Sequence, residues 1–488
     1  MFSTKSLYTK AGFQVHQNIH WELFTDDQCE AVVASAVELL ERTGIEVASD
    51  LAQQIFAQGG CRVNGSRVRI PSSKINWALA VAPDRLTICD REGSRALRLE
   101  TNNVYFGAAF YPQEALDIAS GELRPFVLAD VEATAKLTQS LPNVDFSAPG
   151  GLPTDVPKRV GELEALKAQL TYTTKPVIQP VRKLAQAKAA HEMASIVAGS
   201  QESFAWDPFI VLHTTIGETL SLSADTTDIL MFAAEKRIPA IASNELVCGL
   251  TAPSTSAAAI IAALANSLAS LLLVELVREG APFIAGGFFT FNDVKNGLYP
   301  YGAPEVSLLG AGLASVLRYL RLPSFGFGGA TDSKTSDAQL GLESAFSILH
   351  AGLAGTNLVY GAGILDSGGV SSAVSLVMAE ELMAITRRIM RGVEMDEDRL
   401  ARGVIDDVQP GGHYLGSKHT RYYFKSEQFW PTLMNRKRID DWTAEGEKTL
   451  GQRSKEKTLR LLESFDGPVL DGAQVTQLQA VVDKAAGK

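Results

Sequence analysis

Residues 209–243 read FIVLHTTIGETLSLSADTTDILMFAAEKRIPAIAS, and their pattern decides the fold. Two short runs rich in branched apolar residues, at 209–214 and 238–243, have the length of buried strands. The stretch between them, at 224–234, has the length and composition of a helix. Strand, helix and strand in this order predict a right-handed βαβ unit with two parallel strands.

The same alternation continues along most of the chain, from residue 101 to residue 394. Eight strands are predicted, at residues 104–107, 144–147, 177–180, 209–214, 238–243, 283–287, 324–328 and 357–361. Helical stretches separate them, and eight such units in succession favour a closed (β/α)8 TIM barrel over an open doubly wound sheet. No Gly-x-Gly-x-x-Gly motif follows an early strand, which argues against a dinucleotide-binding fold.

The two flanking regions have different patterns. Residues 1–100 predict an α+β extension, with a helix capped by Asp26 or Asp27 and a hairpin at Asn64-Gly65. Residues 395–488 are helical and polar with a cluster of aromatic residues, and we expect them to pack across the barrel as a cap.

Composition excludes several classes of protein. The 488-residue chain has a formal net charge of −10, so no attraction to nucleic acid or anionic lipid is expected. Its four cysteines have neither CxxC nor metal-ligand spacing, and no apolar signal segment begins the chain, which together favour the cytoplasm and no bound metal. Residues 257–277 are apolar enough to span a membrane, but Asn266 and Glu275 interrupt them, so a buried helix is favoured.

In a barrel, functional side chains come from the carboxyl ends of the strands and the loops that follow them. Polar side chains buried there need partners or a purpose. The candidates read from those positions are Tyr105, Phe106, Gln179, His213, Asn244, Glu245, Asp332, Lys334 and Tyr360. His350, near the end of a predicted helix, is also a candidate, although a hydrogen-bonded core histidine fits its position as well.

Two loops carry most of the candidate chemistry. Residues 328–339 read GGATDSKTSDAQ, in which Asp332 and Lys334 could act on a substrate or could pair with each other and stabilise the loop. The loop from Phe288 to Tyr301 carries five aromatic rings, which could form a cage for a cation, a hydrophobic lid or an interface. Tyr105, Phe106, Phe110 and Tyr111 form a second aromatic group near the expected mouth.

An ordered series of short segments resembles the trimethylamine methyltransferase family over nearly the whole chain. These segments are ELLERTGIEV at 38–47, LTAP at 250–253, TDSK at 331–334, DAQ at 337–339, AGTNLV at 354–359, LDSG at 365–368, and HT at 419–420 with Trp442. The resemblance implies a barrel subunit that removes a methyl group from an amine and passes it to Co(I) of a separate corrinoid-binding protein. The corrinoid then belongs to the partner, and no tightly bound cofactor is expected.

One branch of that family inserts pyrrolysine in the barrel, whereas this sequence has only standard residues. It therefore resembles the branch associated with quaternary amines such as glycine betaine, and a small quaternary or tertiary methylamine is the expected substrate. We assign Asp332, Lys334 and Glu245 as catalytic candidates, and the remaining candidates to substrate binding. Aromatic faces with one carboxylate would hold the ammonium group, and a homo-oligomer is also expected.

Two alternatives remain open at this stage. One is a barrel lyase or aldolase that uses Lys334 as a Schiff-base amine, since burial at a strand end can lower the pKa of a lysine. The other is a non-catalytic barrel that binds a betaine for sensing or assembly.

Overall fold

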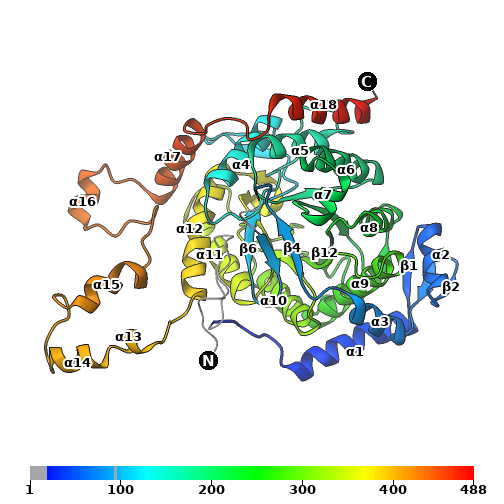
Figure 1. Ribbon diagram of the computed structural model, residues 1–488, viewed down its shortest axis with the longest axis horizontal. Helices are drawn as coiled ribbons and strands as arrows, with labels where there is room; N and C mark the ends of the chain where they lie inside the picture. Colours follow the sequence, from blue (N-terminus) through cyan, green and yellow to red (C-terminus); the bar gives the residue numbers. More distant parts are fainter. Residues whose placement is uncertain (1–18, 93–95, 488) are drawn as a thin grey trace.

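The computed structural model describes residues 19–92 and 96–487, and a parallel sheet lies at its centre (Figure 1). Seven strands are hydrogen-bonded in the order β6 (Tyr105–Ala108), β15 (Leu358–Ala362), β14 (Ser324–Phe327), β13 (Phe283–Phe291), β12 (Ala240–Cys248), β10 (Ile210–Ile216) and β9 (Val177–Pro180). Every pairing between these neighbours is parallel.

The predicted strand at 144–147 joins the two edges of this sheet. Parallel bridges connect Gly107 of β6 to Phe146, and Ser147 to Val177 of β9. The Ile178 N–H donates to the Ser147 carbonyl at 2.9 Å. A side chain at Gly107 would clash, because a Cβ there would lie 2.0 Å from the Phe146 ring. The seven strands and residues 144–147 therefore make eight barrel strands in the predicted order, which confirms a TIM barrel-like fold.

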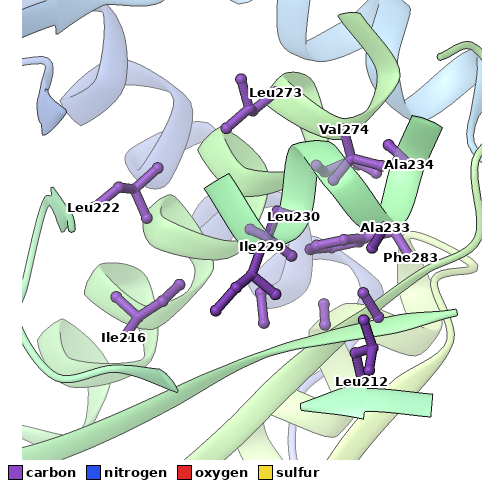
Figure 2. Packing of buried hydrophobic residues seen from close by; sticks show 14 of the residues in the cluster. Leu212, Ile216, Leu222, Ile229, Leu230, Ala233, Ala234, Leu273, Val274 and Phe283 are labelled. Atoms are coloured by element: carbon purple, nitrogen blue, oxygen red, sulfur yellow. The ribbon is translucent and has the colours of Figure 1, made fainter. Parts of the chain in front are cut away.

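One helix of the outer ring follows each barrel strand, and these helices cover the outside of the sheet (Figure 1). They are α4 (Leu128–Ser140), α5 (Gly161–Tyr172), α6 (Leu184–Ala198), α8 (Ala224–Lys236), α9 (Ser256–Val277), α10 (Pro304–Tyr319), α11 (Ala338–Leu353) and α12 (Ala373–Met390), with the short α7 (Gln201–Trp206) after α6. Branched apolar side chains fill the space between the layers, as Leu212 of β10 and Ile229 and Leu230 of α8 do (Figure 2).

The N-terminal extension combines helices and short strands, as predicted. It contains α1 (Asp26–Arg42), β1 (Ile45–Val47), α2 (Asp50–Gln58), β2 (Arg62–Asn64), β3 (Arg67–Arg69), α3 (Ser72–Val81), β4 (Leu86–Cys89) and β5 (Ala96–Leu99). The β2–β3 hairpin is confirmed. The predicted cap of α1 is wrong by one residue, because the Thr25 side chain accepts the Gln28 N–H and both aspartates fall in the first turn.

The apolar helix α9 is buried by this extension. Helices α1, α2 and α3 pack on it from outside, and β12 and β13 contact its other face. Its most apolar window is long and apolar enough to cross a membrane, but 83% of that window is buried inside the protein. The interrupting Asn266 is hydrogen-bonded, since its Nδ2 donates to the Glu218 carbonyl at 2.9 Å. Packing therefore accounts for the composition of α9.

Short strands from the loops line the rim of the barrel. β7 (Glu114–Leu116), β8 (Leu123–Pro125), β16 (Ile364–Leu365) and β17 (Val370–Ser371) form one small sheet, and a 3-10 turn, η2 (Asp366–Gly368), lies between β16 and β17. β11 (Ser221–Leu222) pairs in parallel with β1 and so joins the barrel to the extension.

The C-terminal region is helical as predicted, but its helices do not pack across the barrel. It contains α13 (Glu397–Leu400), α14 (Arg402–Val408), α15 (Lys418–Glu427), α16 (Ile439–Ala444), α17 (Leu450–Glu463) and α18 (Gly472–Ala486). α17 packs on α12 and α4, and α18 packs on α5 and α6, all of which belong to the outer ring. Helices α13 to α16 project away from the barrel (Figure 1).

Candidate functional site

Five aromatic rings follow one another around the carboxyl end of the barrel, and we call them the aromatic wall: Phe110, Tyr360, Phe327, Phe288 and Tyr301. Phe110 and Tyr360 have centroids 4.7 Å apart, and Tyr360 and Phe327 have centroids 5.1 Å apart. Phe288 continues the wall, at 4.3 Å from Phe327 and 4.5 Å from Tyr301. Since the rings come from three strands, β13, β14 and β15, and from the loops after β6 and β13, the wall exists only in the closed barrel.

His213 lies fully buried on β10, beside this wall. Its ring centroid is 4.9 Å from that of Phe110, and its Nδ1 is 3.0 Å from the Tyr111 hydroxyl. Burial lowers the pKa of His213 to about 3, so the imidazole is neutral at neutral pH. The Tyr111 hydroxyl can donate to Nδ1, which places the imidazole proton on Nε2. Nε2 has no hydrogen-bond partner among the described residues.

Glu245 lies on β12 at this end of the barrel, and its side chain is half-buried. Its Oε1 is out of contact with solvent and has no hydrogen-bond partner in the described part of the chain. Burial raises the pKa of Glu245 to about 7, and the positive charge of Arg182 opposes that rise. After burial itself, the Glu245 charge is the next cause of the raised pKa of Tyr111, of Tyr301 and of Tyr360. The carboxyl group therefore lies within electrostatic reach of all three phenol rings.

Arg182 follows β9 by two residues and lies at the rim. Its guanidinium carbon is 5.4 Å from the centroid of the Tyr111 ring, and its Nε is 3.8 Å from Glu162 Oε1. The side chain is 53% exposed. A narrow pocket at this point is lined by Tyr111, Pro149, Gly151, Leu152, Glu162, Ala165, Gln179, Pro180 and Arg182. A cation is thus available to a ligand that enters beside Tyr111.

The structure brings Asp332 to the site as a positioning residue. Its carboxylate accepts the N–H groups of Tyr301 at 2.7 Å and Gly302 at 3.0 Å, and the Ser367 hydroxyl at 2.8 Å. These bonds hold Tyr301 in the aromatic wall. Lys334 points away from the wall, since its Nζ binds the Asp332 carbonyl at 2.6 Å and Asp366 at 3.2 Å, and its side chain is 66% exposed.

The side-chain amides of Asn244 and Gln179 form hydrogen bonds within the barrel. Asn244 Nδ2 donates to the carbonyls of Ala263 and Gly286 and to the Ser267 hydroxyl, and its Oδ1 accepts from Asn266. Gln179 Nε2 donates to two carbonyls, at 3.1 Å and 2.9 Å. Both amides are fully buried with these partners, so their hydrogen-bonding groups serve the fold, and Gln179 reaches the site only as a wall of the pocket.

Three candidates lie away from the site. Tyr105 begins β6 and its hydroxyl accepts the Arg98 N–H at the opposite end of the barrel. Phe106 alternates to the outer face of the strand, where Arg387 of α12 lies 5.5 Å from its ring. His350 is on α11, with its Nδ1 2.7 Å from the Phe346 carbonyl and its ring 5.2 Å from Trp21. His350 is hydrogen-bonded as expected, but it is half-buried on the outside of the barrel and so does not lie in the core.

Arg182 is the residue that sequence reasoning missed. It follows the predicted strand at 177–180, so the rule that selected the other candidates also applied to it. Among the described residues, no group of three His, Cys, Asp or Glu side chains is placed to hold a metal ion.

Comparison with known proteins identifies relatives along the whole chain. A family model described as trimethylamine methyltransferase (MTTB) matches residues 4–487. The glycine betaine methyltransferase of Desulfitobacterium hafniense (strain Y51) is 30% identical over 470 residues, covering 95% of this chain and 96% of that protein. The trimethylamine methyltransferase MttB of Methanosarcina barkeri is 27% identical over 485 residues, covering 97% of each.

Among solved structures, the monomethylamine methyltransferase (MtmB) of Methanosarcina barkeri is similar, with a TM-score of 0.47 and 14% identity. The alignment covers 91% of this chain and 94% of that chain.

Proposed function

Because the chain belongs to the trimethylamine methyltransferase family and is therefore a methyltransferase, we propose that it demethylates a quaternary methylamine that carries a carboxylate, as glycine betaine does. The methyl group passes to Co(I) of a corrinoid held by a separate protein, which acts as the second substrate.

The Glu245 carboxyl group beside the aromatic wall is the observation that carries this proposal. A quaternary ammonium group donates no hydrogen bond, so proteins bind it with aromatic faces and a nearby negative charge. Glu245 supplies the charge and has an oxygen with no partner among the described residues, and it lies within electrostatic reach of Tyr111, Tyr301 and Tyr360. A bound cation would offset the cost of burying the carboxylate and would lower its pKa.

Two titratable groups of the site offer no proton to a leaving amine, and the third, Glu245, is needed in its charged form to bind the cation. His213 has its pKa lowered to about 3, and burial raises the pKa of Tyr301 to about 12, so neither group readily protonates a leaving amine at neutral pH. A quaternary nitrogen needs no such proton. The bond between nitrogen and one methyl carbon breaks, its electron pair stays on nitrogen, and a neutral tertiary amine leaves.

The corrinoid supplies the nucleophile that takes the methyl carbon, and this chain supplies positioning. The site residues remove water from the cation and fix the direction of one methyl group toward the mouth, where the second protein has access. Asp332 contributes by holding Tyr301 through the backbone of its loop.

Arg182 is the group we assign to the carboxylate of the substrate. Lys334 does not suit this task, because its amine is bound to Asp366 and to a backbone carbonyl, and Asn244 and Gln179 are committed to hydrogen bonds within the barrel. Arg182 makes a 3.8 Å contact to Glu162 and lies against Tyr111, and its side chain is 53% exposed, so it can reach a ligand. A guanidinium at the rim and a carboxylate within its electrostatic reach match the two charges of a zwitterion.

The two alternatives are less consistent with the site. A Schiff-base mechanism needs a lysine that burial keeps neutral, whereas Lys334 is 66% exposed and pairs with Asp366. A non-catalytic binding protein would have the same pocket, so the two functions are separated only by measuring methyl transfer.

A thermal-shift series followed by a transfer assay tests the proposal. Glycine betaine or a close analogue is expected to raise the melting temperature, and the same compound is expected to methylate Co(I) cobalamin in the presence of the protein. Stabilisation without transfer would support the binding-protein alternative. No stabilisation by any quaternary amine would contradict the substrate assignment.

A further inference from the structure

Two segments at the mouth of the barrel lie side by side, although α11 separates them in the sequence. They are TDSK at 331–334 and LDSG at 365–368, and the proposed function leaves most of their residues without a task. The Asp366 N–H donates to the Ser333 carbonyl at 3.0 Å, and the Asp366 carboxylate pairs with Lys334 Nζ at 3.2 Å. The two segments thus form one structure, which we call the rim clamp.

The backbone of the second segment is left-handed at three successive residues, Asp366, Ser367 and Gly368. Their φ angles are +51°, +52° and +98°. Residues other than glycine seldom adopt such angles, and they keep them where the surroundings fix them, most often at functional sites. Here the Ser367 hydroxyl donates to Asp332 Oδ1 at 2.8 Å. The first segment therefore holds the second in a conformation that its own side chains disfavour.

The turn formed by these residues lies directly on the ring of Tyr301. A Cβ added at Gly368 would lie 2.7 Å from the Tyr301 hydroxyl oxygen and 2.8 Å from carbon atoms of its ring, which is closer than such atoms approach in proteins. The same ring belongs to the aromatic wall, with its centroid 4.5 Å from that of Phe288 and 5.4 Å from that of Phe327. The Tyr301 ring therefore keeps its place in the wall only beside a residue without a side chain.

Glu343 of α11 holds the clamp from the first segment. Its Oε2 accepts the Thr331 hydroxyl at 2.5 Å and the Asp332 N–H at 2.8 Å. A Cβ added at Gly302 would lie 2.3 Å from the Glu343 carboxyl carbon, so the backbone after Tyr301 lies on this carboxyl group. Since the Asp332 carboxylate binds the same backbone, Glu343 acts on Tyr301 both through Asp332 and by direct contact with the next residue.

We propose that the rim clamp and Glu343 set the position of the Tyr301 ring, and through it the affinity of the site for a quaternary ammonium group. Gly368 and Glu343 are positioning residues in this scheme, because they act through Tyr301. The inference rests on the proposed function in one respect, that Tyr301 faces the ligand. A ring attracts a cation only within about 6 Å of its centroid, and a ring fixed beforehand loses little freedom on binding, so its placement decides the affinity.

The contacts of the clamp differ in strength. The side chains of Lys334 and Asp366 are 66% and 43% exposed, and ion pairs at such exposure contribute little. The Asp332 carboxylate accepts two backbone N–H groups and a hydroxyl, each at 3.0 Å or less, and hydrogen bonds to a charged group are the stronger kind. We therefore expect Lys334→Ala to move Tyr301 little, and Glu343→Ala, which releases Asp332, to move it more.

Fluorine NMR of the full-length protein labelled with fluorotyrosine follows the Tyr301 ring directly, and the loss of one signal in Tyr301→Phe identifies it. Gly368→Ala and Glu343→Ala should each shift that signal. Glu343→Gln, which keeps an acceptor for the Asp332 N–H, should return the signal most of the way to its natural position. Gly65→Ala is the matched control, because it also adds a Cβ to a glycine with positive φ but nothing among the described residues lies within 4 Å of that Cβ.

Calorimetric titration with tetramethylammonium tests the effect on the ligand. Gly368→Ala should raise the Kd about tenfold, the size of one contact between a cation and a ring, while Gly65→Ala should leave it unchanged. In a Tyr301→Ala background, where no ring remains to be displaced, Gly368→Ala should change the Kd by less than about twofold. A turn that only stabilised the fold would weaken binding equally in both backgrounds.

Two results would overturn the proposal. One is an unshifted Tyr301 signal in both Gly368→Ala and Glu343→Ala, and the other is a loss of affinity of about tenfold from Gly368→Ala in the Tyr301→Ala background. Failure of the natural protein to bind any quaternary ammonium would instead contradict the proposed substrate. The fluorine signals would then still decide whether the clamp sets the position of Tyr301, because they need no ligand.

Discussion

Buried polar side chains at the two ends of the barrel differ in the partners that surround them. At the amino end, Asn357 donates to the Asn103 carbonyl at 2.9 Å and accepts the Ser324 N–H at 2.9 Å. Lys175 at the same end donates to the Leu141 carbonyl at 2.7 Å. At the carboxyl end, Glu245 Oε1 and His213 Nε2 are buried with no hydrogen-bond partner among the described residues. The amino end also has unpartnered atoms among the described residues, Oδ1 of Asn102 and Oδ1 of Asn103. Asn357 and Lys175 thus stabilise the fold, whereas we expect Glu245 Oε1 and His213 Nε2 to contact a ligand, because functional groups of a barrel gather at its carboxyl end.

The largest expected effect that tests this contrast is that of Glu245→Gln. Loss of the charge beside the bound cation should lower kcat/KM by roughly a thousandfold, as removal of a key electrostatic group does. The same substitution should not lower the stability of the folded protein at pH 8. The pKa of Glu245 is raised to about 7 in the fold, so its folding contribution is favourable below its unfolded pKa and is lost as pH rises through 7.

Melting temperatures at pH 8 and pH 5 check the second part. The glutamine protein should melt no lower than the natural protein at pH 8, and Glu218→Gln, an exposed glutamate after β10, should change neither property. A destabilised glutamine protein with normal turnover would mean that Glu245 belongs with the structural polar groups.

The next largest effect should come from the amino end. Asn357→Ala removes hydrogen bonds to Asn103 and Ser324 and leaves their backbone groups buried without partners. The free energy of unfolding should fall by about 3 kcal/mol, while the turnover of the folded protein stays the same. Denaturant unfolding measures this loss, with Asn435→Ala, an exposed residue between α15 and α16, as the matched control. A loss below about 1 kcal/mol would contradict the structural role.

A smaller effect is expected for Arg182→Ala, and it should depend on the substrate. The Kd for glycine betaine should rise about 30-fold, because a charge-assisted contact to its carboxylate is lost. Binding of tetramethylammonium, which has no carboxylate, should be unchanged. Calorimetric titration of both ligands checks the difference, and equal weakening of both would show that Arg182 only shapes the pocket. Arg182→Lys should retain part of the affinity.

The smallest effect concerns pH. Because burial raises the pKa of Glu245 to about 7, the carboxylate that binds the cation is mostly protonated at pH 6 and mostly charged at pH 8. The Kd for a quaternary ammonium ligand should therefore increase about tenfold between pH 8 and pH 6. The Glu245→Gln protein should show a flat profile over this interval. A flat profile in the natural protein would place the titrating group elsewhere.

The barrel was predictable because each βαβ unit leaves a local pattern of apolar runs. The residues at which the strands end were less predictable, and one such error concerns two candidate site residues. β12 runs to Cys248, five residues beyond the predicted end at 243, so Asn244 and Glu245 are neighbours in a strand. Their side chains alternate, so that Asn244 meets Ser267 of α9 and Glu245 faces the barrel interior. A one-residue difference in position therefore separates a structural side chain from a candidate site residue.

Other features depend on contacts between distant parts of the chain. The hydrogen bonds that commit Asp332 to the backbone of Tyr301 connect two loops, and no local pattern indicates them. The helicity of residues 395–488 follows from composition, but their position depends on which surfaces they meet. The sequence pattern could not separate a segment that covers its own barrel from one that extends away from it.

Helices α1, α2 and α3 bury α9 in the folded protein, but the ribosome makes them long before it makes α9. At roughly 5–20 residues per second, the ribosome completes α1 about 10 to 50 s before it completes α9. During that interval Val32, Ala36 and Leu40, which are buried in the finished protein, have no α9 to pack on. The N-terminal extension must therefore remain incompletely folded until half the chain has emerged, and this interval is when the nascent protein most needs a chaperone.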